Sequence, residues 1–162
     1  MLHSDKNNPF KYYDPRSIEV YKNLSVPKGV VIPTTDEGAW EYFSKFRWVY
    51  NKLDIAISQG IKCAPMGIEP ENYPVFMKPI INLHGMGVGS RALSTEQEYD
   101  KEKHKSGYFW MEFFKGEHLS HDLVIKDGKI VFSIVFKGWP LEKGMFDYWE
   151  TTEAPESVKD YL

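Results

Sequence analysis

The chain has 162 residues and a mass of 18.9 kDa, which suits one domain with a hydrophobic core and is short for two. Its hydrophobic fraction of 42% and aromatic fraction of 15% exclude a disordered polypeptide, because these side chains supply ample buriable area. With 20 Lys and Arg against 23 Asp and Glu, the net charge of −3 favours neither nucleic acid nor a membrane as a partner.

Residues 1–27 are expected to form an N-terminal arm, since this stretch is polar and interrupted by Pro9 and Pro15. It has no positively charged segment followed by an apolar one, so no signal peptide is predicted. No window of the chain approaches the roughly 20 apolar residues of a membrane span. We therefore expect a cytoplasmic protein.

Residues 28–138 are expected to form the folded subdomain. After a short apolar strand at residues 29–33, the Thr-x-x-Glu pattern from Thr34 to Glu37 predicts the start of a helix. Aromatic residues then recur every three or four positions, and helical periodicity continues to Gly60. This pattern predicts one helix that buries a stripe made of Trp40, Phe43, Phe46 and Tyr50.

Four strands are predicted after this helix, at residues 74–81, 108–114, 119–126 and 129–137. Asp127-Gly128 separates the last two and favours a tight antiparallel hairpin, because both residues tolerate positive φ. The charged stretch at residues 94–107 indicates a solvated helix or a mobile loop. The predicted fold is therefore α+β: a small, largely antiparallel sheet of about four strands, covered on one face by the aromatic helix.

A lysine and a group of glycines mark the candidate site. Lys78 lies within an apolar strand, where an ammonium group is costly unless it meets an anion. Glycines at alternate positions in the next loop let backbone N–H groups approach an oxyanion closely. The spacing fits neither the P-loop nor the Rossmann fingerprint, and a simple connecting loop beside a lysine that reaches solvent remains the alternative. The candidate phosphate-binding residues are Lys78, Gly85, Gly87, Gly89 and Ser90.

The wider order of motifs resembles the ATP-grasp superfamily. Asn51-Lys52-Leu53 and GIKCAP at residues 60–65 precede a strand reading PVFMKP at residues 74–79. The glycine loop at residues 84–91 follows, and then MEFFKGEHLSHD at residues 111–122. This ordered set is similar to the small-lobe half of an ATP-grasp domain.

The resemblance implies that ATP is the ligand. Lys52 and Lys78 would contact the phosphates, and the glycine loop with Ser90 would cover them. The backbone of Glu112, Phe113 and Phe114 would meet adenine. Glu117 would contact the ribose, with His118 as the alternative for this role.

The metal-binding half of the family is not recognisable in this sequence. ATP-grasp enzymes carry carboxylates and an Asn for Mg²⁺ beyond the hinge hairpin, and nothing after Gly138 matches them. We therefore expect no catalytic or metal-binding residues here, and Mg²⁺ only if a missing half supplies its ligands. The chain is predicted to be either a truncated piece of an ATP-dependent carboxylate–amine or carboxylate–thiol ligase, or a degenerate domain that binds without reacting.

A different class of function is also open. The chain could be a non-enzymatic interaction domain without a nucleotide site, in which the aromatic C-terminal segment at residues 139–162 docks on a missing domain or on a second copy. His118 and His121 are three apart on a strand and so point to opposite faces, which argues against a shared metal ion. Cys63, the single cysteine, is expected to be a small buried apolar residue.

Overall fold

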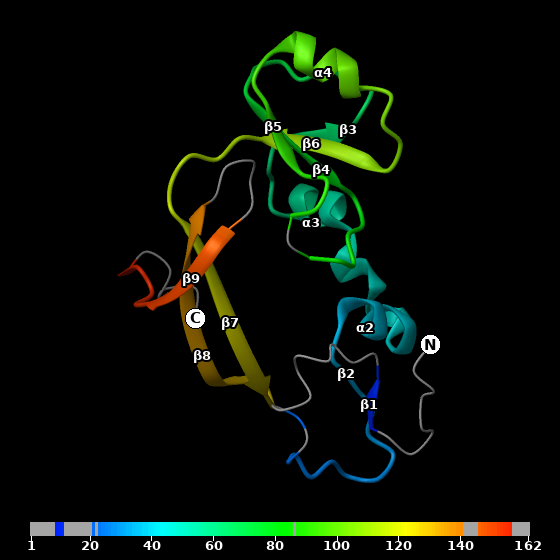
Figure 1. The fold of residues 1–162 in the computed structure, drawn as a ribbon, viewed down its shortest axis with the longest axis vertical. Helices are drawn as coiled ribbons and strands as arrows, with labels where there is room; N and C mark the ends of the chain where they lie inside the picture. Colours follow the sequence, from blue (N-terminus) through cyan, green and yellow to red (C-terminus); the bar gives the residue numbers. More distant parts are fainter. Residues whose placement is uncertain (1–8, 12–20, 22, 86, 141–145, 157–162) are drawn as a thin grey trace.

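The computed structural model of the protein describes residues 9–11, 21, 23–85, 87–140 and 146–156. The predicted α+β class is confirmed: helices accompany two antiparallel sheets (Figure 1). The predicted N-terminal arm lies largely outside the described residues; within it, β1 (Phe10–Lys11) pairs in parallel with β2 (Ile32–Pro33). None of the described helices combines the length and the apolar character that crossing a membrane requires.

A four-stranded sheet forms the centre of the fold. Its strand order is β3 (Cys63–Pro65), β6 (Tyr108–Glu112), β4 (Val75–Pro79) and β5 (Arg91–Leu93), with antiparallel neighbours throughout. The side chains of β4 alternate between the faces of the sheet, as a strand requires. Val75 and Met77 are 3% and 1% exposed on one face, which places Phe76 and Lys78 on the other.

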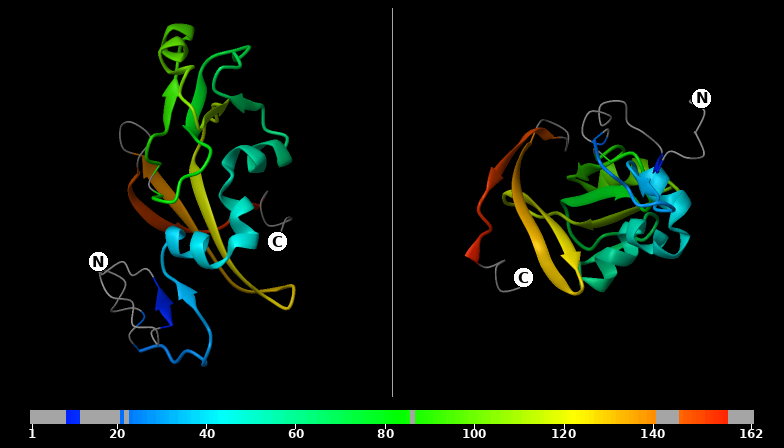
Figure 2. Two further views of the ribbon diagram at one scale, coloured as in Figure 1. Left: turned by 90° about the vertical axis from the view of Figure 1, so that its right-hand side faces the viewer. Right: turned by 90° about the horizontal axis from the view of Figure 1, so that it is seen from below.

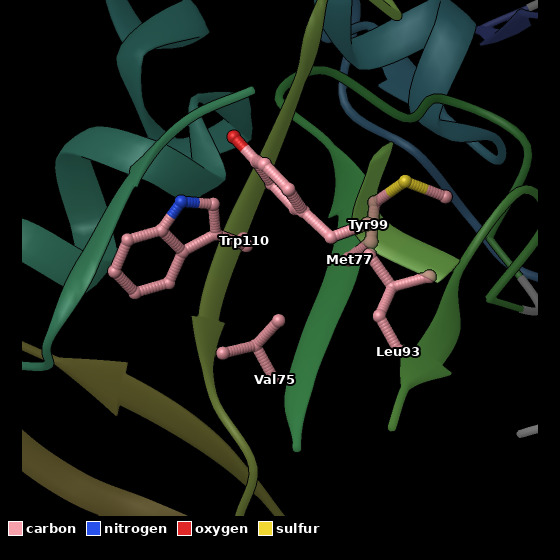
Figure 3. Packing of buried hydrophobic residues seen from close by; sticks show 5 residues of the cluster. All are labelled: Val75, Met77, Leu93, Tyr99 and Trp110. Carbon is pink, nitrogen blue, oxygen red and sulfur yellow. The ribbon is translucent and has the colours of Figure 1, made fainter. Parts of the chain in front are cut away.

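α4 (Glu96–Glu102) covers the first face of this sheet through one aromatic side chain. Tyr99 is fully buried and packs with Val75, Met77, Leu93 and Trp110 (Figure 3). The helix begins with a capping box, since Thr95 Oγ1 accepts from the Glu98 N–H at 3.3 Å and Glu98 Oε2 accepts from the Ser94 N–H at 2.7 Å. The charged stretch at residues 94–107 therefore contains a helix that contributes Tyr99 to the core, and it is not merely a solvated segment.

α3 (Lys52–Ser58) covers the opposite face. Ala56 packs against Phe109 and Met111, with Leu53 and Cys63 at the margin of the cluster. In the ribbon views α3 and α4 lie on opposite sides of the four-stranded sheet (Figures 1 and 2).

The prediction of a single helix that carries the aromatic stripe is wrong. The chain forms three separate helices instead: α2 (Asp36–Tyr42), a 3₁₀ helix η2 (Ser44–Tyr50) and α3. α2 begins at Thr35, whose Oγ1 accepts from the Gly38 N–H at 3.2 Å. The predicted stripe is not buried as a unit, because Phe43 is 41% and Phe46 is 50% exposed.

β7 (His118–Lys126), β8 (Lys129–Pro140) and β9 (Phe146–Thr152) form a second, three-stranded sheet beside the first (Figure 2). The predicted hairpin is confirmed, since Asp127 and Gly128 have φ values of 51° and 73° and Lys126 pairs with Lys129. The prediction of one sheet for all four strands is wrong, and β9 was not predicted. The rest of the C-terminal segment, at residues 141–145 and 157–162, lies outside the described residues.

Candidate functional site

A cleft of about 640 Å³ lies between the two sheets. Its walls come from β4 and the end of β6 on one side and from β7, β8 and Phe146 on the other, with the start of α3 and the glycine loop closing two further sides. The structure brings most of the predicted site residues together here: Lys52, Lys78, Gly87, Ser90, Glu112, Phe113, Phe114 and Glu117. Gly85 and Gly89 do not line the cleft, so the direct contacts predicted for them are not supported.

Two lysines from different elements converge on this cleft. Lys52 begins α3, where its backbone N–H donates to Ile80 O at 2.9 Å, and Lys78 lies on the α3-facing side of β4. Burial lowers the pKa of Lys52, although the charge of Asp36 opposes this effect. Burial also lowers the pKa of Lys78, and the positive charge of Lys52 lowers it further.

The ammonium group of Lys78 has no hydrogen bond or ion pair with any residue that the structure describes. Its nearest favourable contacts are the rings of Phe76 and Phe109, each with its centroid 5.8 Å from Nζ. A part-buried cation beside a second cation is unfavourable without a counter-charge. This pair of lysines is therefore suited to bind an anion.

The glycine loop between β4 and β5 is held at its base by a side chain that the sequence prediction missed. Asn82 is 8% exposed; its Nδ2 donates to Gly85 O at 3.1 Å and its Oδ1 accepts from the His84 N–H at 2.9 Å. Asn82 therefore fixes the point at which the loop leaves the sheet.

Not all of the loop amides are available to a ligand. The Val88 N–H donates to Gly85 O at 3.3 Å and the Ser90 N–H donates to Gly87 O at 2.9 Å, so both are used within the loop. Gly89 has a structural reason to be glycine: φ is 78°, and a Cβ would lie 2.6 Å from the Tyr108 hydroxyl oxygen. Among the described residues of this loop, Gly87 and Ser90 line the cleft.

The opposite part of the cleft is apolar and aromatic. Phe76 and Phe113 pack at a tilt with centroids 6.4 Å apart, Met111 and Phe114 complete this wall, and Phe146 faces the cleft from the second sheet. The backbone groups of Phe113 and Phe114, just beyond β6, have no backbone hydrogen bond within the described part of the chain. The Glu112 N–H is already used, since it donates to Lys62 O at 2.9 Å. The wall offers an apolar, aromatic surface edged by the N–H and C=O groups of Phe113 and Phe114.

The polar rim on the second sheet contains Glu117, Lys137 and His118. Glu117 Oε1 and Lys137 Nζ form an ion pair, and Lys137 Nζ also lies 4.5 Å from the centroid of Trp139. The His118 ring packs against Phe146 at 4.5 Å and edge-on to Trp149 at 5.5 Å, measured between centroids. Burial lowers the pKa of His118, and the charge of Lys78 lowers it further.

The donor set does not fit a metal site. Among the described residues, no group of three or more His, Cys, Asp or Glu side chains is close enough to hold an ion. His118 faces the cleft, whereas His121 Nε2 lies 2.7 Å from Ser133 Oγ. Cys63 packs beside α3, and burial raises the pKa of its thiol, so it behaves as a small apolar residue. No residue is assigned to Mg²⁺.

A search among known protein families finds none that matches this sequence, and a search among curated proteins finds no match either. The cleft is therefore interpreted from its own geometry and charge.

Proposed function

We propose that this chain binds an adenine nucleotide, ATP, in the cleft between its two sheets. The observation that carries the proposal is the convergence of Lys52 and Lys78, with no carboxylate paired to Lys78 in the described structure, beside an aromatic wall. A polyphosphate would supply the negative charge that the lysines lack, and a planar base suits the wall. The two requirements together favour a nucleotide over a simple anion.

Each part of the nucleotide has a place in this proposal. The phosphates lie at Lys52 and Lys78, under Gly87 and Ser90. The adenine ring lies against Phe76 and Phe113, where the backbone groups of Phe113 and Phe114 offer a donor and an acceptor for its polar edge. The ribose lies toward Glu117, which remains hydrogen-bonding competent while paired with Lys137.

We propose further, from the resemblance to the ATP-grasp superfamily, that this binding belongs to a carboxylate–amine or carboxylate–thiol ligase, or to a truncated or degenerate relative of one. Phosphoryl transfer in such enzymes depends on metal ions that neutralise developing charge. Since the described residues form no metal site, the proposal assigns nucleotide binding to this chain and no catalytic step.

Thermal unfolding with and without ATP tests the proposal. A ligand at a hundred times its Kd adds about 2.7 kcal/mol of stability, which raises Tm by several degrees. We expect this shift in the wild-type chain, a much smaller one in Lys78→Ala, and an unchanged one in the control Lys62→Ala. Lys62 is a matched control because it pairs with Glu71 on the surface and does not line the cleft. An absent shift in the wild type, or an equal one in Lys78→Ala, would remove the nucleotide function.

The second candidate is a non-enzymatic interaction domain, and exposed apolar side chains favour it. At the tip of the β7–β8 hairpin Val124, Ile125, Val131 and Phe132 are 52% to 62% exposed, and Trp149 on β9 is 44% exposed. Patches of this kind mark association surfaces. Sedimentation of the chain over a range of concentrations tests self-association through this sheet. If the chain is a monomer at every concentration and its Tm rises with ATP, this candidate is excluded in favour of the first.

A further inference from the structure

His118 is placed where it can respond to a bound anion. It begins β7 and lines the cleft together with Lys52 and Lys78. Its ring is held by Phe146 and Trp149, and neither ring nitrogen has a hydrogen-bond partner among the described residues. An imidazole that lines a cleft and whose nitrogens have no such partner is available to a ligand.

The charges around His118 are unbalanced in the ligand-free protein. The charged groups that line the same cleft are Lys52, Lys78, Glu112, Glu117 and Lys137. Glu117 pairs with Lys137, and Glu112 Oε1 accepts from the Lys62 N–H at 3.4 Å. Among these groups, Lys78 is the one whose charge lowers the pKa of the imidazole.

The neutral imidazole is favoured, because burial and the charge of Lys78 both lower its pKa. A phosphate group bound at the two lysines would reverse the sign of the local charge and favour the imidazolium. The protonated ring could then donate to a phosphate oxygen.

We propose that His118 is a third phosphate-contacting group of this cleft and takes up a proton when a polyphosphate ligand binds. The inference rests on the proposed function in using the same cleft, but it concerns the phosphates and not the base. Binding then becomes tighter as pH falls through the range between the pKa of the free and of the bound state. One proton taken up per ligand changes Kd by up to about tenfold per pH unit.

Isothermal titration calorimetry of the full chain tests this proton uptake. ATP and inorganic tripolyphosphate are titrated near pH 7, where imidazole titrates, in two buffers of different ionisation enthalpy. Phosphate groups also exchange protons near this pH, so the quantity compared is the difference between wild type and His118→Asn with one ligand. We expect His118→Asn to take up fewer protons, and its Kd to lose the corresponding pH dependence.

His121→Asn is the matched control. It lies on the same strand but contacts Ser133 away from the cleft, so its proton uptake should equal that of the wild type. Should His118→Asn fail to give a normal melting curve, NMR titration of the wild-type imidazole gives the same information. The pKa of His118 should rise when tripolyphosphate is added.

The outcomes separate this inference from the proposed function. ATP binding with equal proton uptake in wild type and His118→Asn, or an imidazole pKa that tripolyphosphate leaves unchanged, overturns the role of His118 and leaves the nucleotide site standing. Tripolyphosphate binding with His118-dependent uptake but without ATP binding supports the role of His118 and removes the nucleotide function. Binding of neither ligand overturns both.

Discussion

Lys52 and Lys78 line one cleft, and the positive charge of Lys52 lowers the pKa of the Lys78 ammonium. A pair of like charges in a part-buried position lowers the stability of the ligand-free protein. Proteins commonly retain such a cost where function requires it. The two lysine charges that suggest an anion site therefore also predict that removing one of them raises the stability of the ligand-free protein and weakens ligand binding.

The first prediction is that Lys78→Met stabilises the ligand-free chain while it abolishes the ATP-dependent shift. The methionine keeps most of the apolar stem and removes the charge, so we expect a gain of about 1 kcal/mol in the free energy of unfolding. Urea unfolding with and without ATP measures both effects. Lys62→Met, at an exposed ion pair, should change stability by less than about 1 kcal/mol and keep the shift. A less stable Lys78→Met protein, or one that still responds to ATP, would contradict the argument.

The second prediction concerns the pH dependence of the same pair of proteins. Because the folded state lowers the pKa of Lys78, the unfolded chain holds its proton more tightly, and the stability of the wild type rises with pH through the folded-state pKa. The penalty is fully present below that pKa and disappears near the unfolded value of about 10.4. The stability difference between Lys78→Met and wild type should thus narrow from neutral pH toward pH 10. Urea unfolding at a series of pH values checks this, and a difference that widened with pH would exclude Lys78 as its source.

Local signals in the sequence predicted several elements correctly. The apolar run at residues 74–81 predicts β4, and Asp127-Gly128 predicts the β7–β8 hairpin, because both depend on the chain within a few residues. Phe76 could also have been assigned to the cleft, since it shares a strand face with Lys78. Asn82 follows that strand as a polar residue before a glycine loop, which is a usable but weak signal.

Other features depend on tertiary packing that no local pattern records. β5 contains three residues, too few for a period, and it forms because Leu93 is buried beside Tyr99. The prediction of a buried aromatic stripe is wrong because residues 44–50 form a 3₁₀ helix in place of an α-helix. With three residues per turn, Phe43, Phe46 and Val49 fall on one side, and all three are exposed. No sequence pattern indicated that Phe146 lines the cleft, because apolar and polar residues do not alternate clearly along β9.

The third prediction is that Asn82→Ala weakens the binding of ATP more than that of adenosine. The change removes the two hydrogen bonds to Gly85 O and the His84 N–H that hold the start of the glycine loop. In the proposed complex this loop covers the phosphates and does not contact the adenine ring. A lost pair of part-buried hydrogen bonds also costs about 1–3 kcal/mol of stability. Calorimetric titration with both ligands, at a temperature where the variant is folded, gives the ratio of affinities. An equal loss for ATP and adenosine would indicate a general structural effect without a specific role in the loop.

The fourth prediction separates two reasons for glycine in the same loop. Gly85 and Gly89 both have positive φ, at 63° and 78°, but only at Gly89 would a Cβ meet the Tyr108 hydroxyl, at 2.6 Å. Gly85→Ala should therefore cost about 1–2 kcal/mol for the backbone conformation alone, and Gly89→Ala should cost more because the ring of Tyr108 must shift.

Tyr108→Phe removes the hydroxyl and should bring the cost of Gly89→Ala down toward that of Gly85→Ala, while leaving the cost of Gly85→Ala unchanged. Urea unfolding of the single and double variants forms the two thermodynamic cycles that measure this coupling. Equal costs for the two alanine variants, or the same coupling of Tyr108→Phe to both, would show that backbone conformation and not the close approach to Tyr108 makes position 89 a glycine.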